Sequence, residues 1–375
     1  MTNQRSPEGA RRDTRQMTRH LVVDISGHGL GHLSQVAPVV GRLARLEPRI
    51  RFTLRSALPE SLLRSRIGLP FDYLEADLDR GMLMHDAISV DVDASCAWYG
   101  AFHANYARRL EREIRQLGAL RPDLLLADVP YIGLAAAQRL GIPSAALCSL
   151  NWADIYRHYC RERQGSKTIF DEILAAYAGA SVFLQPEPSM AMPDLHNRRP
   201  IAPIARHGGA DRERLRSLDG TGDAERFILL GFGGIGMHFP LDGLPVLERT
   251  CWIVPDALET ARSDIVAQSR FGMDYIDLLA SVDLVLTKTG YGTQVEAVVN
   301  HVPQLCIERP GWPEEAGLFA WCRAHGYFEK TRLEELGSDR TTQTITRLLQ
   351  TPWEKESVVA DGDRDAAGIL SGFLD

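Results

Sequence analysis

The chain has 375 residues, of which 45% are hydrophobic and 24% are charged, and its formal net charge is −7. This composition excludes a disordered, collagen-like or coiled-coil chain, and the negative charge argues against a general nucleic-acid binder, which needs a basic face. At roughly 150 residues per domain, the length predicts two domains, each large enough to bury its own core.

The first 19 residues are polar and rich in arginine, and no apolar run follows that could act as a signal peptide. We therefore predict a disordered tail over 1–19. No apolar stretch reaches the ~18 residues that a spanning helix needs, so we expect no transmembrane segment. The cysteines show neither C-x-x-C spacing nor a metal-ligand cluster with histidine, which favours free thiols and a reducing, cytoplasmic location. The cysteines are Cys96, Cys148, Cys160, Cys251, Cys306 and Cys322.

Short apolar blocks alternate with helical stretches through the first half of the chain. The blocks expected as strands are 20–25, 51–54, 123–128, 144–148 and 180–184. Between them, 35–46 and 106–117 carry apolar residues at helical spacing. Strands that alternate with helices in this way predict a parallel sheet covered on both faces.

A glycine-rich loop, Ser26-Gly27-His28-Gly29-Leu30-Gly31-His32, follows the first predicted strand, and a helix is expected to begin near Leu33 or Ser34. Glycines such as Gly31 let the backbone approach a ligand, and a helix start leaves N–H groups free for an anion. A histidine here suits a general base, because its unperturbed pKa is about 6.5. His28 and His32 are both candidates, and the alternative is that either one only caps the helix or bonds the loop backbone.

Two further strand ends in this half carry residues of interest. Asp128, at the end of the strand 123–128, could orient one of the histidines, or could equally be a capping or ion-pair residue. Asn151, Trp152 and Asp154 follow the strand that ends near Ser149, which would point them into a cleft between domains. Trp152 could stack on a sugar or another flat acceptor, or could pack the domain interface.

A proline-rich stretch and a polar segment over 207–225 separate the two halves, and we interpret the polar segment as a linker or a domain boundary. The second half then repeats the pattern, with strands expected at 227–230, 250–254, 282–286 and 304–307, and helices at 273–280, 293–300 and 364–374. The last of these helices could pack back across the junction.

These elements predict two doubly wound, Rossmann-like α/β domains that face each other across a cleft. In such sheets, ligands bind outside the carboxyl ends of the strands. The predicted parts are the tail at 1–19, an N-terminal domain at 20–205, a C-terminal domain at 206–355 and a returning helix at 356–375.

Two loops of the second half suit a phosphate. Gly233 and Gly234 lie in a glycine-rich loop after the strand 227–230, where backbone amides could surround an anion. Further on, the segment Thr287-Lys288-Thr289-Gly290-Tyr291-Gly292-Thr293 runs from a strand into a helix start and would suit a diphosphate. It lacks the order of a P-loop, so kinase or ATPase chemistry is not indicated. Glu296, about one turn later, could bond a ribose or be an exposed helical carboxylate.

The motifs together resemble the GT-B type of nucleotide-sugar glycosyltransferase. In particular, 26–32, 78–81, 151–156 and 287–293 look like the glycosyltransferase-like half of plant and bacterial L-arabinokinases. The resemblance implies that the C-terminal domain holds the donor diphosphate and the N-terminal domain holds the acceptor.

Residue by residue, the resemblance places the donor loop on Gly290, Gly292 and Thr293, and the ribose-binding carboxylate on Glu296. The donor-sugar pair falls on Glu314 and Glu315, where the family usually has Asp-Gln or Asn-Gln. His32 matches the Gly-His that opens the first helix in many inverting members, with His28 as the alternative base.

The function that the resemblance implies is transfer of a sugar, with inversion, from a nucleotide diphosphate donor to an acceptor that the sequence does not identify. The expected donor is a UDP-sugar, which is a co-substrate, so no cofactor is expected. Asp91-Val92-Asp93 is interpreted as a loop carboxylate pair and no Asp-x-Asp motif follows a strand, which predicts metal independence. Two alternatives are a nucleotide-sugar epimerase or hydrolase, and a catalytically silent sensor of sugar nucleotides.

Overall fold

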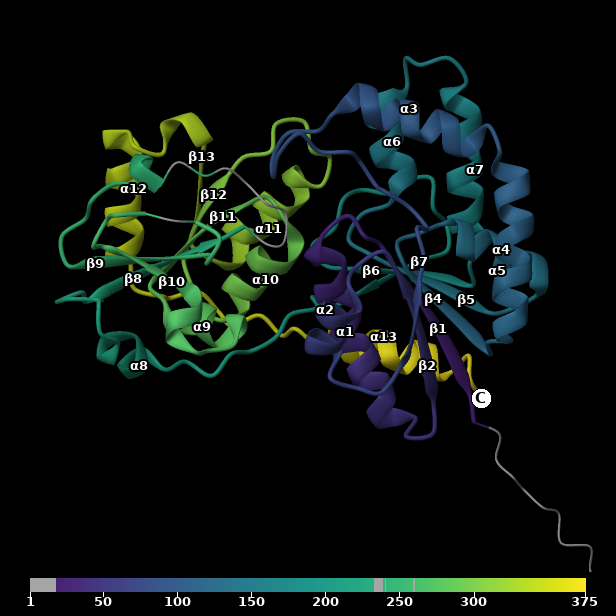
Figure 1. The fold of residues 1–375 in the computed structure, drawn as a ribbon, viewed down its shortest axis with the longest axis horizontal. Coiled ribbons are helices and arrows are strands. Elements are labelled where there is room, and N and C mark those ends of the chain that lie inside the picture. Colours follow the sequence, from purple (N-terminus) through teal and green to yellow (C-terminus); the bar gives the residue numbers. More distant parts are fainter. Residues whose placement is uncertain (1–17, 233–238, 240, 259) are drawn as a thin grey trace, which may run out of the picture.

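The computed structural model describes residues 18–232, 239, 241–258 and 260–375, and these form two parallel sheets with helices packed against them (Figure 1). The predicted fold class is confirmed. None of the helices in these ranges combines the length and the apolar character that crossing a membrane requires.

The N-terminal sheet has seven parallel strands in the order β3-β2-β1-β4-β5-β6-β7. Its strands are β1 (His20–Ile25), β2 (Arg51–Ser56), β3 (Asp72–Glu75), β4 (Leu124–Asp128), β5 (Ser144–Leu147), β6 (Val182–Pro186) and β7 (Arg198–Ile201). Its helices are α1 (Leu30–Leu46), α2 (Glu60–Ile67), α3 (Val92–His103), α4 (Tyr106–Leu120), α5 (Ile132–Leu140), α6 (Trp152–Cys160) and α7 (Ser166–Ala178). Side chains of β1 alternate between two cores: Leu21 and Val23 pack with α1 and α2, and Val22 packs with α5 and α6.

The C-terminal sheet has six parallel strands in the order β10-β9-β8-β11-β12-β13. Its strands are β8 (Arg226–Gly231), β9 (Thr250–Val254), β10 (Ile265–Ala267), β11 (Leu284–Lys288), β12 (Gln304–Ile307) and β13 (Phe328–Thr331). Its helices are α8 (Arg212–Ser217), α9 (Tyr275–Ser281), α10 (Tyr291–Val299), α11 (Glu315–His325) and α12 (Asp339–Gln350), with short 3-10 turns at Leu241–Gly243, Gln268–Phe271 and Leu333–Glu335.

The last helix, α13 (Gly362–Ser371), packs against α1 and β7 of the N-terminal domain (Figure 1). Its Ala366, Ala367 and Leu370 are buried in the same core as α1. The chain therefore crosses between the domains twice, once before β8 and once after α12.

Two local predictions are wrong. Helix α1 begins at Leu30 rather than near Leu33 or Ser34, because Gly29 adopts a φ of 140° at the N-cap and lets the chain turn into the helix earlier. The segment 207–225 lies between the two sheets, as a domain boundary would, but it is not a plain linker, because it contains α8, which begins after Asp211 and buries Leu215. The earlier start of α1 places His32 in its first turn.

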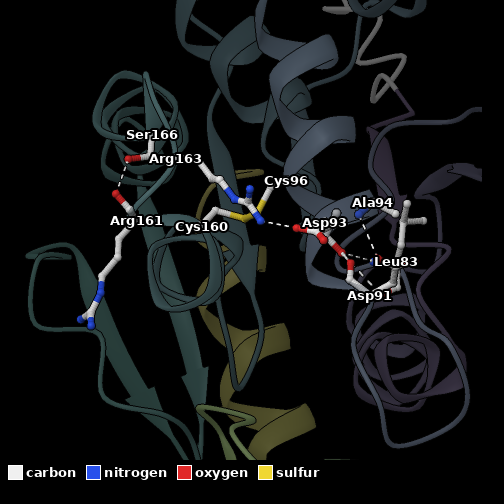
Figure 2. The surroundings of a disulfide bond; sticks show 10 residues. Leu83, Asp91, Asp93, Ala94, Cys96, Cys160, Arg161, Arg163 and Ser166 are labelled. Atoms are coloured by element: carbon white, nitrogen blue, oxygen red, sulfur yellow. Dashed lines mark hydrogen bonds and ion pairs between the residues drawn. A yellow bond between two sulfur atoms is a disulfide. The ribbon is translucent and has the colours of Figure 1, made fainter.

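A disulfide joins Cys96 of α3 to Cys160 at the end of α6, beside the ion pair of Asp93 and Arg163 (Figure 2). The prediction of free thiols is therefore wrong for this pair and holds for Cys148, Cys251, Cys306 and Cys322, which are free and buried. Packing of α3 on α6 brings together two cysteines that are 64 residues apart in the sequence, a distance at which spacing carries no pairing signal. Because disulfides are rare in reducing compartments, this bond does not agree with the expected reducing location.

We expect unreduced, denatured protein to show four titratable thiols, the six cysteines minus the bonded two. Cys96→Ser should raise the number to five by freeing Cys160, and the control Cys251→Ser should lower it to three. Reduction should lower the free energy of unfolding by at most about 4 kcal/mol, because the unfolded chain then regains the conformational entropy that closing a loop of this length removes. Six reactive thiols before reduction would show that the bond is absent.

Candidate active site

A cleft of about 950 Å³ lies between the two domains. Helix α1 forms one wall, and the carboxyl ends of β8 and β11 with the start of α10 form the other. A Cβ on Gly292 would lie 2.7 Å from Oγ of Ser34, so glycine lets α10 approach α1 this closely without moving the Ser34 side chain. Seven predicted donor residues line this cleft: Gly31, Thr287, Lys288, Gly290, Gly292, Thr293 and Glu296.

The start of α10 faces the cleft without a side-chain N-cap among the described residues. Gly290 donates its backbone N–H to Oε1 of Gln294 at 3.0 Å. The hydroxyl of Thr287 donates to the carbonyl of Gly231 at 2.6 Å, and the hydroxyl of Thr293 lies 3.2 Å from that of Tyr275. These hydroxyls therefore hold β8, β11 and α9 together beneath the helix start. Gly233 and Gly234 lie outside the described residues.

Glu296 is 4% exposed, so it is not an exposed helical carboxylate. Its Oε1 accepts a hydrogen bond from Nε of Arg206 at 2.8 Å. Burial raises the pKa of this carboxyl, and the charge of Arg206 partly opposes the rise. Glu296 reaches the cleft as one member of an ion pair.

His32 and Asp128 form a buried pair at the carboxyl edge of the N-terminal sheet. Strands β1 and β4 are neighbours, with Ile25 opposite Asp128, and the first turn of α1 carries His32 over this edge. Nδ1 of His32 lies 2.9 Å from Oδ1 of Asp128. No hydrogen bond to Nε2 of His32 exists within the described ranges. Burial alone would lower the pKa of His32, but the charge and hydrogen bond of Asp128, together with the charges of Asp79 and Glu314, outweigh it and raise the pKa.

Cys148 completes a group of three potential metal ligands. Its Sγ lies 3.7 Å from Nδ1 of His32, and the ligand atoms of Cys148, His32 and Asp128 all lie within 4.8 Å of one another. The three residues could hold a metal ion, which the sequence spacing did not indicate because each comes from a different segment. In this structure Nδ1 of His32 is already engaged by Asp128.

His28 lies beside this pair in an aromatic enclosure. Its ring is edge-on to Trp152 at 5.1 Å between centroids and parallel to Trp312 at 6.2 Å. Its Nε2 is buried without a hydrogen-bond partner among the residues that the structure describes. Burial, together with the charges of His32, Arg309 and Lys288, lowers the pKa of His28 to about 3. His28 is therefore neutral at physiological pH.

Asp79 anchors this enclosure. It accepts hydrogen bonds from the Trp152 indole at 2.6 Å and from the Ser26 hydroxyl at 2.9 Å. Burial raises the pKa of Asp79 to about 6. Gly81 has a φ of 56°, and a Cβ there would meet Trp152 at 2.6 Å, so glycine is required for this packing.

The residues predicted for the acceptor side have local structural contacts. Asn151 caps α6, because its Oδ1 accepts from the backbone N–H of Asp154 at 2.8 Å. Asp154 pairs with Arg157, and Trp152 is fully buried. None of Asn151, Trp152 and Asp154 lines the 950 Å³ cleft. Of the two roles expected for Trp152, stacking on an acceptor or packing at the domain interface, this structure therefore agrees with packing.

Glu314 and Glu315 are also engaged by protein groups and do not line the cleft. Glu314 accepts from the Ser149 hydroxyl of the other domain at 2.6 Å and from the Trp312 indole at 3.2 Å. Glu315 accepts from the Thr289 hydroxyl at 2.9 Å and from the backbone N–H of Arg309 at 3.1 Å. The loop before α11 thus joins the two domains over the histidines.

Residues that sequence reasoning missed are Asp79, Cys148, Arg309 and Trp312. Asp79 and Gly81 belong to the segment 78–81, which carries part of the family resemblance, and this resemblance was the signal that could have indicated Asp79. Arg309 and Trp312 lie in a turn-rich loop, where no periodicity indicates which side chains face inward.

No family model matches the chain. An L-arabinokinase of Arabidopsis thaliana is 25% identical over 333 residues, which cover 84% of this chain and 31% of that protein. The chain thus spans about a third of the length of this curated relative.

Solved structures identify the fold as GT-B. The kitacinnamycin glycotransferase is 15% identical, covers 94% of this chain and 93% of its own, and has a TM-score of 0.60. The spinosyn rhamnosyltransferase SpnG, complexed with thymidine diphosphate, is 17% identical with coverages of 95% and 96% and a TM-score of 0.57. A UDP-glucosyltransferase from Polygonum tinctorium is 14% identical with coverages of 96% and 100% and a TM-score of 0.54.

Proposed function

We propose that the chain is a glycosyltransferase that moves a sugar from a nucleotide diphosphate donor to an acceptor hydroxyl, with inversion and without a metal ion. The observation that carries this proposal is the buried His32–Asp128 pair. His28, His32 and Asp128 do not themselves line the 950 Å³ cleft, but Gly31 and Leu33 on either side of His32 do, opposite the start of α10. A UDP-sugar remains the expected donor. The structures of relatives with thymidine diphosphate and the name of the UDP-glucosyltransferase support a pyrimidine nucleotide.

His32 is the proposed general base. Its Nδ1 faces Asp128, so Nε2 is left to take the proton of the acceptor hydroxyl. The hydroxyl oxygen then forms a bond to the anomeric carbon while the bond from that carbon to the diphosphate oxygen breaks. The electron pair leaves with the nucleotide diphosphate, next to the amide groups at the start of α10. Asp128 positions His32 and stabilises its protonated form.

His28 is a weaker candidate for the base. Its pKa of about 3 leaves little driving force for proton removal, and the structure gives it no carboxylate partner among the described residues. Its free Nε2 can still accept a hydrogen bond.

Calorimetry with UDP, dTDP, GDP and ADP tests the donor site. We expect one pyrimidine nucleoside diphosphate to bind selectively, with the same affinity before and after dialysis against EDTA. Binding of none of the four would remove the proposal, and loss of binding on chelation would contradict metal independence. If a diphosphate binds but no nucleotide sugar is turned over with any acceptor, the protein is a sensor rather than a transferase.

The pH dependence of kcat/KM tests the base. His32 accepts a proton only when neutral, so activity should be complete above its raised pKa and fall about tenfold per pH unit below it. The acid limb should therefore lie above about pH 6.5, the range of an ordinary histidine. Asp128→Asn removes the charge that raises the pKa and should move the limb to lower pH, whereas an unmoved limb would assign it to another group.

A further inference from the structure

The loop 308–314, which joins β12 to α11 in the C-terminal domain, packs into the N-terminal domain. Its Trp312 is 4% exposed and belongs to the core cluster that α3, α5, α6 and α7 form. Among the described residues, Trp312 is the only member of this cluster from the C-terminal domain. Its ring lies parallel to that of His28, with 6.2 Å between the centroids. A side chain of one domain therefore fills a place in the core of the other.

Hydrogen bonds across the domain interface hold the loop in this place. Glu314 is 4% exposed and accepts from the Ser149 hydroxyl, just after β5, at 2.6 Å. The second oxygen of Glu314 accepts from the Trp312 indole at 3.2 Å, so the same carboxylate also fixes the ring. At the rim, the hydroxyl of Tyr159 in α6 donates to the carbonyl of Gly311 at 2.9 Å. The loop is thus attached to the N-terminal domain at two points.

The same loop covers the proposed base. The side chain of His32 is 7% exposed, and neither His32 nor His28 lines the 950 Å³ cleft. Glu314 lies near enough to add its charge to that of Asp128 in raising the pKa of His32. A general base must come within about 3 Å of the hydroxyl oxygen that it deprotonates. An acceptor can therefore reach His32 only after an element that covers it has moved.

Three other residues that lie against His32 cannot withdraw. Asp128 ends β4, Cys148 directly follows β5 and Trp152 begins α6, and all three side chains are fully buried in the N-terminal domain. The loop 308–314, by contrast, belongs to the other domain. It can leave with that domain while the strands and helices around His32 stay in place.

We propose that the loop 308–314 is an autoinhibitory plug, in which Trp312 occupies the place that an acceptor must enter and the Ser149–Glu314 hydrogen bond keeps it there. The inference rests on the proposed function for its effect on catalysis, whereas the plug itself is a contact between two domains. When only a fraction of the molecules is open, the apparent affinity for an acceptor falls by that fraction. Release of the plug should therefore raise activity.

The test is the rate at which N-ethylmaleimide labels Cys148 in the native full chain, with peptide mapping to separate Cys148 from the other thiols. Cys148 is fully buried in the same cluster as Trp312, and its Sγ lies 3.7 Å from Nδ1 of His32, so it reports on opening of this place. Trp312→Ala removes the plug, and Glu314→Ala keeps the indole but deletes the hydrogen bond to Ser149. Each variant should speed the labelling at least about 10-fold.

Two matched variants control for a general loosening of the C-terminal domain. Trp321→Ala removes a buried indole from α11, and Glu308→Ala removes a carboxylate at the start of the loop whose partner is Lys330 of its own domain. Neither should change the labelling rate of Cys148. Thermal melting shows whether each variant is folded, and Glu314→Ala carries the test if Trp312→Ala does not fold.

Unchanged labelling in both Trp312→Ala and Glu314→Ala would overturn the plug and leave the proposed function standing. Faster labelling in Trp312→Ala alone would also overturn it, because the indole would then fill space without moving. Release of UDP from UDP-glucose, with water as the acceptor, measures the effect on catalysis. Faster release by Trp312→Ala supports autoinhibition, and slower release would make Trp312 a working part of the site instead. If labelling accelerates in both variants but no nucleoside diphosphate binds, the plug stands as a gate over His32 and the proposed function falls.

Discussion

His32→Ala is expected to lower kcat at least about 100-fold while the Kd of the nucleoside diphosphate stays nearly unchanged. The reason is positional: His32 contacts Asp128 in the N-terminal domain, whereas the proposed diphosphate site is built from β11 and α10 of the other domain. Removing the imidazole therefore removes the acceptor of the proton without touching the groups that hold the donor. Steady-state kinetics and calorimetry on the same preparation measure the two effects.

Asp128→Asn and His103→Gln complete this experiment. Asp128→Asn keeps the shape of the pair but removes the charge, so kcat should fall while the fold is retained. His103 also bonds a carboxylate, that of Glu172 at 2.6 Å, in the same domain. His103→Gln should leave kcat unchanged, which separates loss of the base from loss of any histidine–carboxylate pair. A His32→Ala enzyme with normal kcat would contradict the assignment and direct attention to His28.

Arg55→Met is expected to lower the free energy of unfolding by about 3–5 kcal/mol. Arg55 lies buried between two carboxylates, with Nε and Nη2 on Asp24 at 2.6 and 2.7 Å and Nη1 on Glu113 at 2.5 Å. Gly133 leaves no space beside them, since a Cβ there would lie 2.2 Å from Oδ2 of Asp24. Without the guanidinium, both carboxylates would stay buried without a cation, and urea denaturation should register the loss.

The pH dependence and two further variants test this explanation. Burial raises the pKa of both Asp24 and Glu113, so in the variant they can be protonated as the pH falls, and its deficit relative to the wild type should shrink. Arg64→Met breaks the exposed pair with Glu60 and should cost less than about 1 kcal/mol. Replacing Asp24, Arg55 and Glu113 together by apolar residues should cost less than Arg55→Met alone. A deficit in Arg55→Met no larger than that of Arg64→Met would show that the buried cluster contributes little.

The local pattern of apolar residues predicted the strands and helices that carry the site. The apolar block at 20–25 coincides with β1, and the blocks at 250–254 and 304–307 coincide with β9 and β12, because buried parallel strands are apolar on both faces. The four edge strands, β3, β7, β10 and β13, were missed. Three of the four residues are exposed in both β3 and β7, so neither carries an apolar run. The glycine-rich loops before α1 and α10 were also predicted, because glycine is favoured where the backbone turns sharply or must approach a ligand closely.

The sequence by itself determined the two-domain α/β architecture, the histidine loop and the glycine-opened helix α10, all of which depend on neighbours along the chain. Only the tertiary structure decided which side chains meet. It placed His32 against Asp128, 96 residues away, joined Cys96 to Cys160, turned Asn151 into a helix cap and left Nε of Arg309 buried without a hydrogen-bond partner among the described residues. The physical reason is that strand order and helix packing set these contacts, and residue spacing along the chain carries no record of either.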